Sequence, residues 1–264
     1  MDLKLTGKTA LVTGSTAGIG FGIARRLLQE GASVVINGRT KKRINSALDQ
    51  LRQAIPDCTV HGCAADFADA AAVQRLLGTH DAVDILINNV GIFAPKPFAE
   101  ITDEEWLHFF EVNVLSGVRL SRHYLPQMLK QNWGRIIFIS SESGIQIPAE
   151  MVHYGTTKTA QLGVSRGLAQ LTAGTNVTVN TVIPGSTRSE GAEKFISDLA
   201  QERGLSKEEV DREFFEKVKP TCLLERFATI DEVATFVTYL ASPLAAANNG
   251  AALRVDGGTI PTIL

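Results

Sequence analysis

The stretch that decides the fold is TALVTGSTAGIG, which runs from Thr9 to Gly20. Its apolar residues 10–12 fit a buried strand, and a turn with three glycines follows, at Gly14, Gly18 and Gly20. A pattern of apolar residues with helical spacing then begins at Ile19 and stops at Gly31. In a strand–turn–helix unit of this kind, glycines let the backbone approach a pyrophosphate at the helix N-terminus. We therefore expect this turn to bind a dinucleotide, with the spacing G-x-x-x-G-x-G rather than G-x-G-x-x-G.

Composition argues against several classes of protein. The chain has 264 residues, of which 44% are hydrophobic and 20% charged, as is typical of a globular protein with a sizeable core. The formal net charge is -2, so no basic excess points to nucleic acid. No apolar run reaches the roughly 18 residues of a membrane span, and the residues before the first strand are too few and too polar for a signal peptide. We therefore expect neither a nucleic-acid partner nor membrane contact.

Cysteine and histidine usage bears on metal binding and on the cellular compartment. The three cysteines, Cys58, Cys63 and Cys222, form no CxxC pair, and the five histidines show no metal-ligand spacing. We therefore expect free thiols in the reducing cytoplasm, and no metal site.

Apolar strands and amphipathic helices alternate along most of the chain. The pattern predicts strands at 10–12, 33–36, 59–63, 84–88, 135–140, 177–183 and 252–255. It predicts helices at 19–31, 41–54, 69–78, 102–130 (with a late kink at Pro126), 154–171 and 229–242. This alternation indicates an α/β fold: a single-domain Rossmann-type, doubly wound parallel sheet of about seven strands, with helices on both faces.

No composition shift marks a domain boundary, so residues 1–264 are expected to form one nucleotide-binding domain. The charged segment at about 186–222 is interpreted as an insertion that closes the substrate pocket. Capping boxes at 102–105, 206–209 and 229–232 mark three helix starts, one of them inside the insertion.

Several residues whose side chains could take part in binding or catalysis follow predicted strands, where parallel sheets bind their ligands. Ser141 follows the fifth strand, while Tyr154 and Lys158 are four residues apart and share one helix face. A carbonyl that receives a hydride needs a proton, which a tyrosine hydroxyl can supply. A nearby ammonium stabilises the phenolate and so lowers the tyrosine pKa, and a serine hydroxyl can donate to the developing oxyanion.

At these positions the sequence resembles the short-chain dehydrogenase/reductase family. The matching motifs span nearly the whole chain: TGSTAGIG at 13–20, Asp66, NNVG at 88–91, Asn113, Ser141, YGTTK at 154–158, PG at 184–185 and VDGG at 255–258. The resemblance implies an NAD(P)-dependent oxidoreductase acting on a carbonyl or an alcohol. It also implies a catalytic set of Asn113, Ser141, Tyr154 and Lys158, in which Ser141 and Tyr154 touch the substrate.

In this family reading Lys158 also holds the nicotinamide ribose, and Asn113 supports a water chain that carries protons to solvent. The cofactor-binding residues that the resemblance implies are Gly14, Ser15, Thr16, Gly18, Ile19, Gly20, Arg39, Asp66, Phe67, Asn89, Gly91, Tyr154, Lys158, Pro184, Gly185 and Thr187.

The end of the second predicted strand bears on the choice of cofactor. NAD-preferring sites place an acid there to bind the ribose 2′-hydroxyl, but this chain has Asn37, and residues 31–48 contain no acid. Arg39 and the cations at 41–43 suit a 2′-phosphate instead. We therefore expect NADP to be preferred, with NAD possible. One departure from NADP-using relatives is Ala17, where many of them carry a basic residue.

A few polar residues bear on the substrate, and apolar segments bear on the oligomeric state. Glu142 and Gln146 are expected to face a polar carbonyl substrate, and His153 to lie on the pocket wall or the surface. The family resemblance, together with surplus apolar residues in two helices and the apolar tail 260–264, favours a homotetramer or a homodimer. The alternatives are a 3-oxoacyl-carrier-protein reductase and a non-catalytic NADP-binding module.

Overall fold

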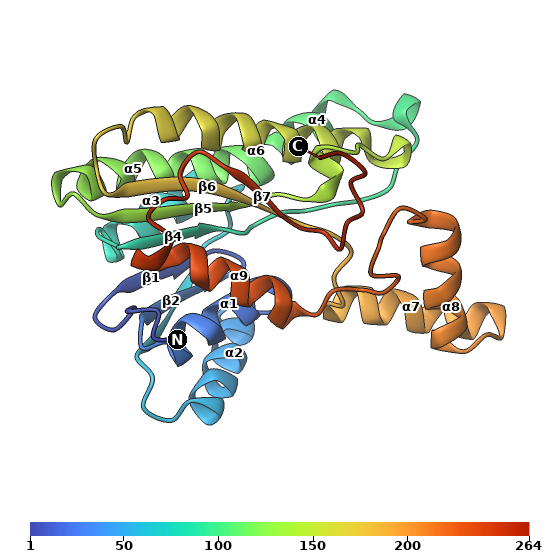
Figure 1. The fold of residues 1–264 in the computed structure, drawn as a ribbon, viewed down its shortest axis with the longest axis horizontal. Coiled ribbons are helices and arrows are strands. Elements are labelled where there is room, and N and C mark those ends of the chain that lie inside the picture. The colour runs from blue at the N-terminus through green and yellow to red at the C-terminus, as the bar shows by residue number, and fades with distance from the viewer. Residues whose placement is uncertain (264) are drawn as a thin grey trace.

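The computed structural model describes residues 1–263 and contains one seven-stranded sheet (Figure 1). Its strands are β1 (Thr9–Val12), β2 (Ser33–Gly38), β3 (Val60–Ala64), β4 (Ile85–Asn88), β5 (Gly134–Ile139), β6 (Val177–Pro184) and β7 (Ala252–Val255). Neighbouring strands all pair in parallel, in the order β3-β2-β1-β4-β5-β6-β7. The predicted doubly wound parallel sheet is confirmed, and its order reverses between β1 and β4, where such sheets form a ligand crevice.

Helices cover both faces of the sheet, as predicted (Figure 1). One face carries α1 (Gly18–Gln29), α2 (Lys41–Ala54) and α9 (Ile230–Ala241), and the other carries α3 (Ala70–Thr79), α5 (Ser116–Lys130) and α6 (Val152–Gln170). Because side chains alternate along a strand, β1 supplies both cores: Val12 packs in the first and Leu11 in the second. The two cores hold the strand ends, and hence the crevice, in place.

The helical region predicted at 102–130 is present but is not one regular helix. It consists of α4 (Asp103–Phe110), a π-helical turn η2 (Glu111–Leu115) and α5, which continues past Pro126 to Lys130. A π turn inserts one extra residue into a helix and is common at functional sites. It was not predicted, because apolar spacing shows helix but not a change in its hydrogen-bond pattern.

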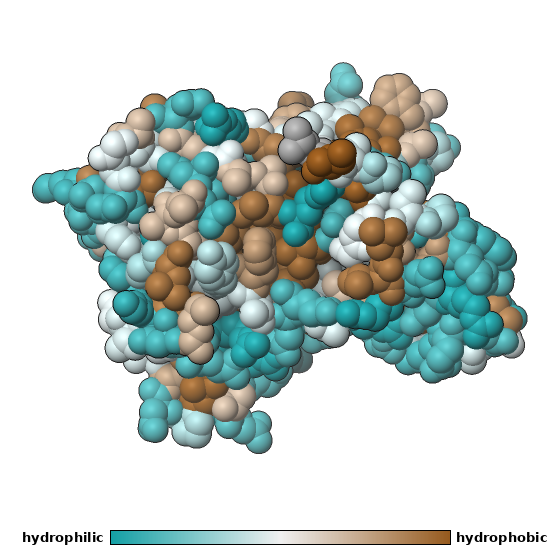
Figure 2. All heavy atoms as spheres, in the orientation of Figure 1, coloured by the Kyte–Doolittle hydropathy of each residue, from teal (hydrophilic) through white to brown (hydrophobic). Residues whose placement is uncertain are grey.

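The insertion forms a small helical unit at the side of the sheet (Figure 1). It contains α7 (Glu190–Arg203), α8 (Lys207–Glu213) and the π-helical turn η5 (Phe214–Val218), with its own apolar cluster around Ile196 and Val210. Figure 2 shows apolar side chains gathered where this unit meets the rest of the molecule.

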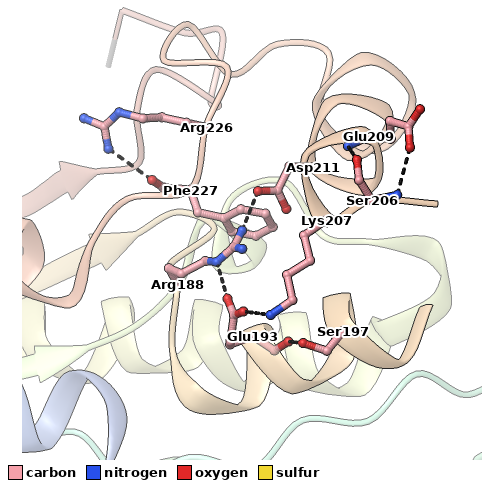
Figure 3. Close-up of polar contacts among 9 residues, drawn as sticks. All are labelled: Arg188, Glu193, Ser197, Ser206, Lys207, Glu209, Asp211, Arg226 and Phe227. Carbon is pink, nitrogen blue, oxygen red and sulfur yellow. Dashed lines mark hydrogen bonds and ion pairs between the residues drawn. The ribbon is translucent and has the colours of Figure 1, made fainter. Parts of the chain in front are cut away.

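Arg188 joins the parts of the insertion through ion pairs (Figure 3). Its guanidinium donates to Glu193 of α7 and to Asp211 of α8, and it lies 5.4 Å from the centroid of the Phe227 ring. Lys207 adds a second ion pair to Glu193. The network holds α7 and α8 together at the start of the insertion.

Short helices η1 (Phe98–Glu100), η3 (Glu142–Gly144), η4 (Ala149–Met151) and η6 (Pro243–Ala245) complete the fold. All three predicted capping boxes are formed, at Thr102, Ser206 and Thr229. Of the apolar tail, Ile260 is buried in its own chain and Ile263 is exposed, while Leu264 lies outside the described residues.

Among residues 1–263, no helix has the length and apolarity needed to cross a bilayer. Across the same part of the chain, no group of three or more His, Cys, Asp and Glu side chains is arranged to hold a metal. All three cysteines are free thiols.

Candidate active site

A cavity of about 330 Å³ lies over the glycine turn at the carboxyl ends of β1, β2 and β4. The backbone reaches it through positive φ angles of 59° at Gly14 and 60° at Gly18. A Cβ at Gly14 would lie 3.1 Å from Val90 Cγ2, and one at Gly20 would lie 2.5 Å from the carbonyl of Gly14. Only glycine fits this cradle, so the turn suits the close approach of a pyrophosphate.

Seven of the predicted cofactor-binding residues line this first cavity: Gly14, Thr16, Arg39, Asp66, Phe67, Asn89 and Gly91. Asn89 holds the turn in shape, because its Nδ2 donates to the carbonyls of Thr13 at 2.9 Å and Gly14 at 3.1 Å. The cavity therefore brings together residues from four separate loops after strands.

The cations of the first cavity come from the end of β2 and the start of α2. Arg39 and Arg43 both line it. Sequence reasoning named Arg43 as one of the local cations but not as a site residue. Its signal was present in the spacing, since Arg43 lies in the first turn of α2, four residues after Arg39.

Asn37 stands where NAD-preferring sites carry an acid, and its side chain hydrogen-bonds to the ends of the neighbouring strands. Its Oδ1 accepts from Gly14 N at 3.1 Å, and its Nδ2 donates to the carbonyls of Cys63 and Ala65, each at 3.2 Å. One buried amide thus joins the ends of β1, β2 and β3. No carboxylate stands at this end of β2, in agreement with a site for a phosphorylated ribose.

The loop after β5 brings Ser141 close to the helix that carries Tyr154 and Lys158. Ser140 Oγ donates to the carbonyl of Lys158 at 2.8 Å, and a Cβ at Gly144 would lie 2.9 Å from Lys158 backbone carbon. Ser141 Oγ accepts from Ser143 N at 3.1 Å. Its hydroxyl proton is left for another acceptor, and the Ser141 hydroxyl lowers the pKa of Tyr154.

Lys158 is buried close to Tyr154. Its Nζ donates to the carbonyl of Ile139 at 2.9 Å and lies 5.7 Å from the centroid of the Tyr154 ring. The Lys158 ammonium also lies 3.2 Å from where a Cβ of Gly91 would stand, so it is next to a residue that lines the first cavity. Burial lowers the pKa of Lys158 to about 8.

The pKa of Tyr154 is shifted in the direction opposite to the one expected from the sequence. Burial raises it, the Ser141 hydroxyl lowers it, and the negative charge of Glu142 raises it again. Desolvation therefore outweighs the lowering effect of Ser141 on the Tyr154 pKa. A lowered Tyr154 pKa needs a further positive charge beside the ring.

Asn113 lies in the π turn and joins three segments. Its Oδ1 accepts from Ile92 N at 2.8 Å, and its Nδ2 donates to Ile92 O at 3.0 Å and to Thr157 Oγ1 at 2.9 Å. Its own backbone carbonyl accepts from Gln161 Nε2. Asn113 thus lies behind the site and fixes the helix of Lys158 against the loop after β4.

A second cavity, of about 730 Å³, lies next to Tyr154. Ser141, Tyr154 and Gly185 line it among the predicted site residues. Glu142 and Gln146 also line it, as expected from their position after the serine. Lys219, at the end of the insertion, lines it too and pairs with Glu142 Oε1 at 2.6 Å. No local pattern predicts that contact, because the two residues are far apart in the chain.

The remaining predicted residues line neither cavity: Ser15, Gly18, Ile19, Gly20, Asn113, Lys158, Pro184 and Thr187. Ser15 is fully buried, with its hydroxyl donating to Val12 O at 2.6 Å and accepting from Asn37 N at 2.9 Å. Thr187 Oγ1 donates to Gly185 O at 3.0 Å, at the start of the insertion.

His153 is placed differently from the prediction. It is buried and lines neither cavity, with its ring centroid 4.1 Å from that of Phe109 and 6.1 Å from that of Trp106. The expectation of a pocket wall or a surface position was wrong, because α4 packs its aromatic side chains over the start of α6. Burial among these rings lowers the His153 pKa.

Comparisons with known proteins agree with this geometry. The short chain dehydrogenase family model matches residues 8–200. An uncharacterized oxidoreductase, YvaG of Bacillus subtilis, is 48% identical over 100% of both chains. The 3-oxoacyl-[acyl-carrier-protein] reductase FabG of Aquifex aeolicus is 32% identical over 98% of this chain and 99% of its own. L-sorbose reductase from Gluconobacter frateurii, solved with NADPH and L-sorbose, superimposes with a TM-score of 0.93 at 30% identity over 100% of both chains.

Proposed function

The chain belongs to the short-chain dehydrogenase family, and on that basis we propose that it transfers a hydride between NADP and a carbonyl or secondary alcohol. The observation that carries the proposal is that Tyr154 lines the second cavity, while Lys158 Nζ, 5.7 Å from the centroid of the Tyr154 ring, lies beside Gly91 of the first cavity. The first cavity holds the glycine cradle with its arginines, and the second is the larger one, which Ser141 also lines. A reacting carbon placed beside Tyr154 would therefore face a dinucleotide from the first cavity.

The nicotinamide, when bound, supplies the hydride or accepts it, and in its oxidised form it adds a positive charge. Tyr154 then gives a proton to the carbonyl oxygen in reduction, or takes it from the alcohol in oxidation. Ser141 donates a hydrogen bond to the same oxygen as negative charge develops there. Lys158 favours the phenolate of Tyr154 by its charge and is close enough to Gly91 to reach a ribose in the first cavity.

The preference for NADP is supported by the charges around the end of β2. Arg39 and Arg43 line the first cavity, and Asn37 replaces the acid that would bind a free ribose 2′-hydroxyl. Asp66 is exposed in the same cavity, and its Oδ1 accepts from Ala68 N at 3.1 Å. The L-sorbose reductase that resembles this chain was solved with NADPH.

The test is Tyr154→Phe, which keeps the ring but removes the acid. We expect the turnover of NADPH with a panel of ketones to fall by at least about a hundredfold, while NADPH affinity, read by fluorescence, stays the same. Tyr239→Phe on α9 is the matched control and should behave like the parent protein. If Tyr154→Phe kept the parent's turnover, the proposed mechanism would be wrong.

The same panel separates the alternatives. A 3-oxoacyl-carrier-protein reductase, which the Aquifex aeolicus relative is, would reduce an acetoacetyl thioester in preference to free ketones. A non-catalytic NADP-binding module would bind NADPH and turn over nothing, but the chain retains both Tyr154 and Lys158.

We extend the proposal to assembly and location. The insertion acts as a lid over the second cavity, and the protein forms a homotetramer or homodimer in the cytoplasm. Leu107 and Leu115, exposed by 70% and 38%, support the assembly because association would remove apolar surface of the region 102–130 from water. Size-exclusion chromatography tests it, and a clean monomer would refute it.

A further inference from the structure

The second cavity contains an ion pair that the hydride-transfer mechanism does not use. Glu142 follows Ser141 directly, and Lys219 comes from the end of the insertion, just after η5. Their side chains are only 5% and 19% exposed, and Glu142 Oε1 lies 2.6 Å from Lys219 Nζ. The pair therefore connects the floor of the cavity, beside the reacting oxygen, to the lid.

The side chains of Lys219 and Glu142 can both form further hydrogen bonds. An ammonium has three donors, and the structure gives Lys219 Nζ one partner among the described residues. Glu142 Oε2 is buried and has no hydrogen-bond partner within the same part of the chain. Lys219 can therefore donate to an oxygen of a ligand, while Glu142 depends on Lys219 as its partner.

The charges in the cavity do not suit an anion. Lys219 is the only cation among the described residues that line it, and Glu142 neutralises that cation. The other charged residue of the lining is Glu150, an exposed carboxylate. A substrate carboxylate would meet a neutralised ammonium and a free negative charge, whereas an uncharged hydroxyl or carbonyl oxygen would accept from Lys219 without any charge penalty.

The outer wall of the cavity is apolar. Phe93, Phe195 and Val218 line it and are 72%, 60% and 57% exposed. Such side chains gain from being covered by an apolar ligand group. The wall thus suits the part of the substrate that lies away from the reacting carbon.

From this arrangement we propose that Glu142 and Lys219 form a neutral recognition pair that selects uncharged hydroxyketones with an apolar substituent over ketones with a carboxylate beside the carbonyl. The proposal rests on the proposed function, because it concerns the substrate of the same site. Lys219 donates to a hydroxyl or carbonyl oxygen on the carbon next to the reacting carbon. Glu142 cancels the charge of Lys219 that would otherwise attract an anion.

Three probes that differ in one group test the proposal. Benzyl hydroxymethyl ketone, benzyl methyl ketone and phenylpyruvate share the aromatic ring and the ketone, but carry a hydroxymethyl, a methyl and a carboxylate group. For the parent protein we expect kcat/KM with NADPH to be highest for the hydroxymethyl ketone and lowest for phenylpyruvate.

Two variants separate the roles of the pair. Glu142→Gln leaves the Lys219 ammonium without its counter-charge, so the kcat/KM of phenylpyruvate relative to the hydroxymethyl ketone should rise by about tenfold or more. The double variant E142Q/K219M removes both charges without leaving either one unpaired. It should lose the preference for hydroxymethyl over methyl by about tenfold and gain nothing for phenylpyruvate.

Lys217→Met is the matched control. Lys217 is two residues from Lys219 and 67% exposed, pairs with Glu213 and does not line the cavity. It should leave all three ratios unchanged. The proposal is overturned if Glu142→Gln changes the phenylpyruvate ratio by less than a factor of about two, or if Lys217→Met changes it as much.

Failure of the proposed function would look different. In that case the parent would turn over none of the three ketones. The order in which the same ketones raise the melting temperature of the NADPH complex, in the parent and in Glu142→Gln, would then still decide whether the pair selects neutral ligands.

Discussion

Asn113 Nδ2 donates a hydrogen bond of 2.9 Å to Thr157 Oγ1, and this contact joins the π turn to the helix that carries Tyr154 and Lys158. Thr157 Oγ1 in turn donates to the carbonyl of Tyr154 at 2.7 Å. Both residues are buried, and Thr157 lines neither cavity. Asn113 therefore acts on the site through Thr157, by fixing the helix on which the proton donor stands.

Thr157→Val should slow turnover without preventing the protein from folding. Valine keeps the shape of threonine but removes the acceptor for Asn113 and the donor to Tyr154. We expect kcat to fall by roughly tenfold with KM nearly unchanged, because misplacing a reacting group weakens the transition state more than ground-state binding. Thr157→Ser should recover most of the loss. Equal kcat values for the valine and serine variants would show that the hydroxyl does not position the helix.

Lys158→Met should abolish turnover and yet make the protein more stable. Burial depresses the pKa of Lys158 from 10.5 to about 8, so keeping this charge inside the folded protein costs roughly 3 kcal/mol at neutral pH. Part of the stability gained by removing this charge is lost, because the carbonyl of Ile139 no longer has a hydrogen-bond donor. We expect the free energy of unfolding without added nucleotide to rise by about 2 kcal/mol at pH 7.

The pH dependence gives the sign of the Lys158 effect independently. The folded protein releases the Lys158 proton near pH 8 and the unfolded chain releases it near pH 10.5. The cost is therefore complete below pH 8 and disappears as the pH rises through that window. Urea unfolding should show the advantage of Lys158→Met shrinking from pH 8 upward. An advantage that is independent of pH, or a loss of stability, would contradict the buried charge.

Arg39→Asp should shift the cofactor preference toward NAD. The change removes a cation from the first cavity and introduces a carboxylate that repels a 2′-phosphate and can accept from a free 2′-hydroxyl. We expect the ratio of kcat/KM for NADPH to that for NADH to fall by at least about tenfold. Lys42→Asp is the control, since Lys42 is three residues from Arg39, at the start of α2, but lies outside the cavity. If both variants changed the ratio equally, general charge rather than the site would explain the preference.

Gly117→Ala tests the packing behind the site. A Cβ at Gly117 would lie 2.6 Å from Phe138 Cε1 and 3.2 Å from Asn88 Cγ, so α5 would be pushed away from β4 and β5. We expect a loss of about 1–3 kcal/mol in the free energy of unfolding, measured by urea titration. Gly78→Ala, in an exposed helical position where the new Cβ would meet no neighbouring group within 4 Å, should be neutral or slightly stabilising. A stabilising Gly117→Ala would show that the two layers are less tightly packed than described.

Local signals in the sequence were enough to predict the fold and much of the site. The predicted strands agree with those of the structure to within one or two residues. For the inner strands the reason is that a buried parallel strand is apolar on both faces. The resemblance named the site residues, and the topology brought seven of them to one cavity. These features depend on residues close together in the chain, or on the rule that ligands bind at the carboxyl ends of strands.

Features that depend on contacts between distant segments were not predictable in the same way. Lys219 reaches Glu142 only because the insertion folds back over the loop after β5. The burial of His153 results from α4 packing on α6, and the raised pKa of Tyr154 results from desolvation. None of these features can be recognised from the spacing of residues along the chain.

The amide of Asn37 has a consequence for how the cofactor preference could evolve. The simplest mutation toward NAD, Asn37→Asp, would set a carboxylate against the carbonyls of Cys63 and Ala65, which now accept from the asparagine. The mutant would have to tolerate a weakened junction of three strands before it gained any selectivity. A substitution at Arg39 lies outside this junction and does not weaken it. Proteins that descend from this one should therefore change their cofactor preference first by substitution of Arg39.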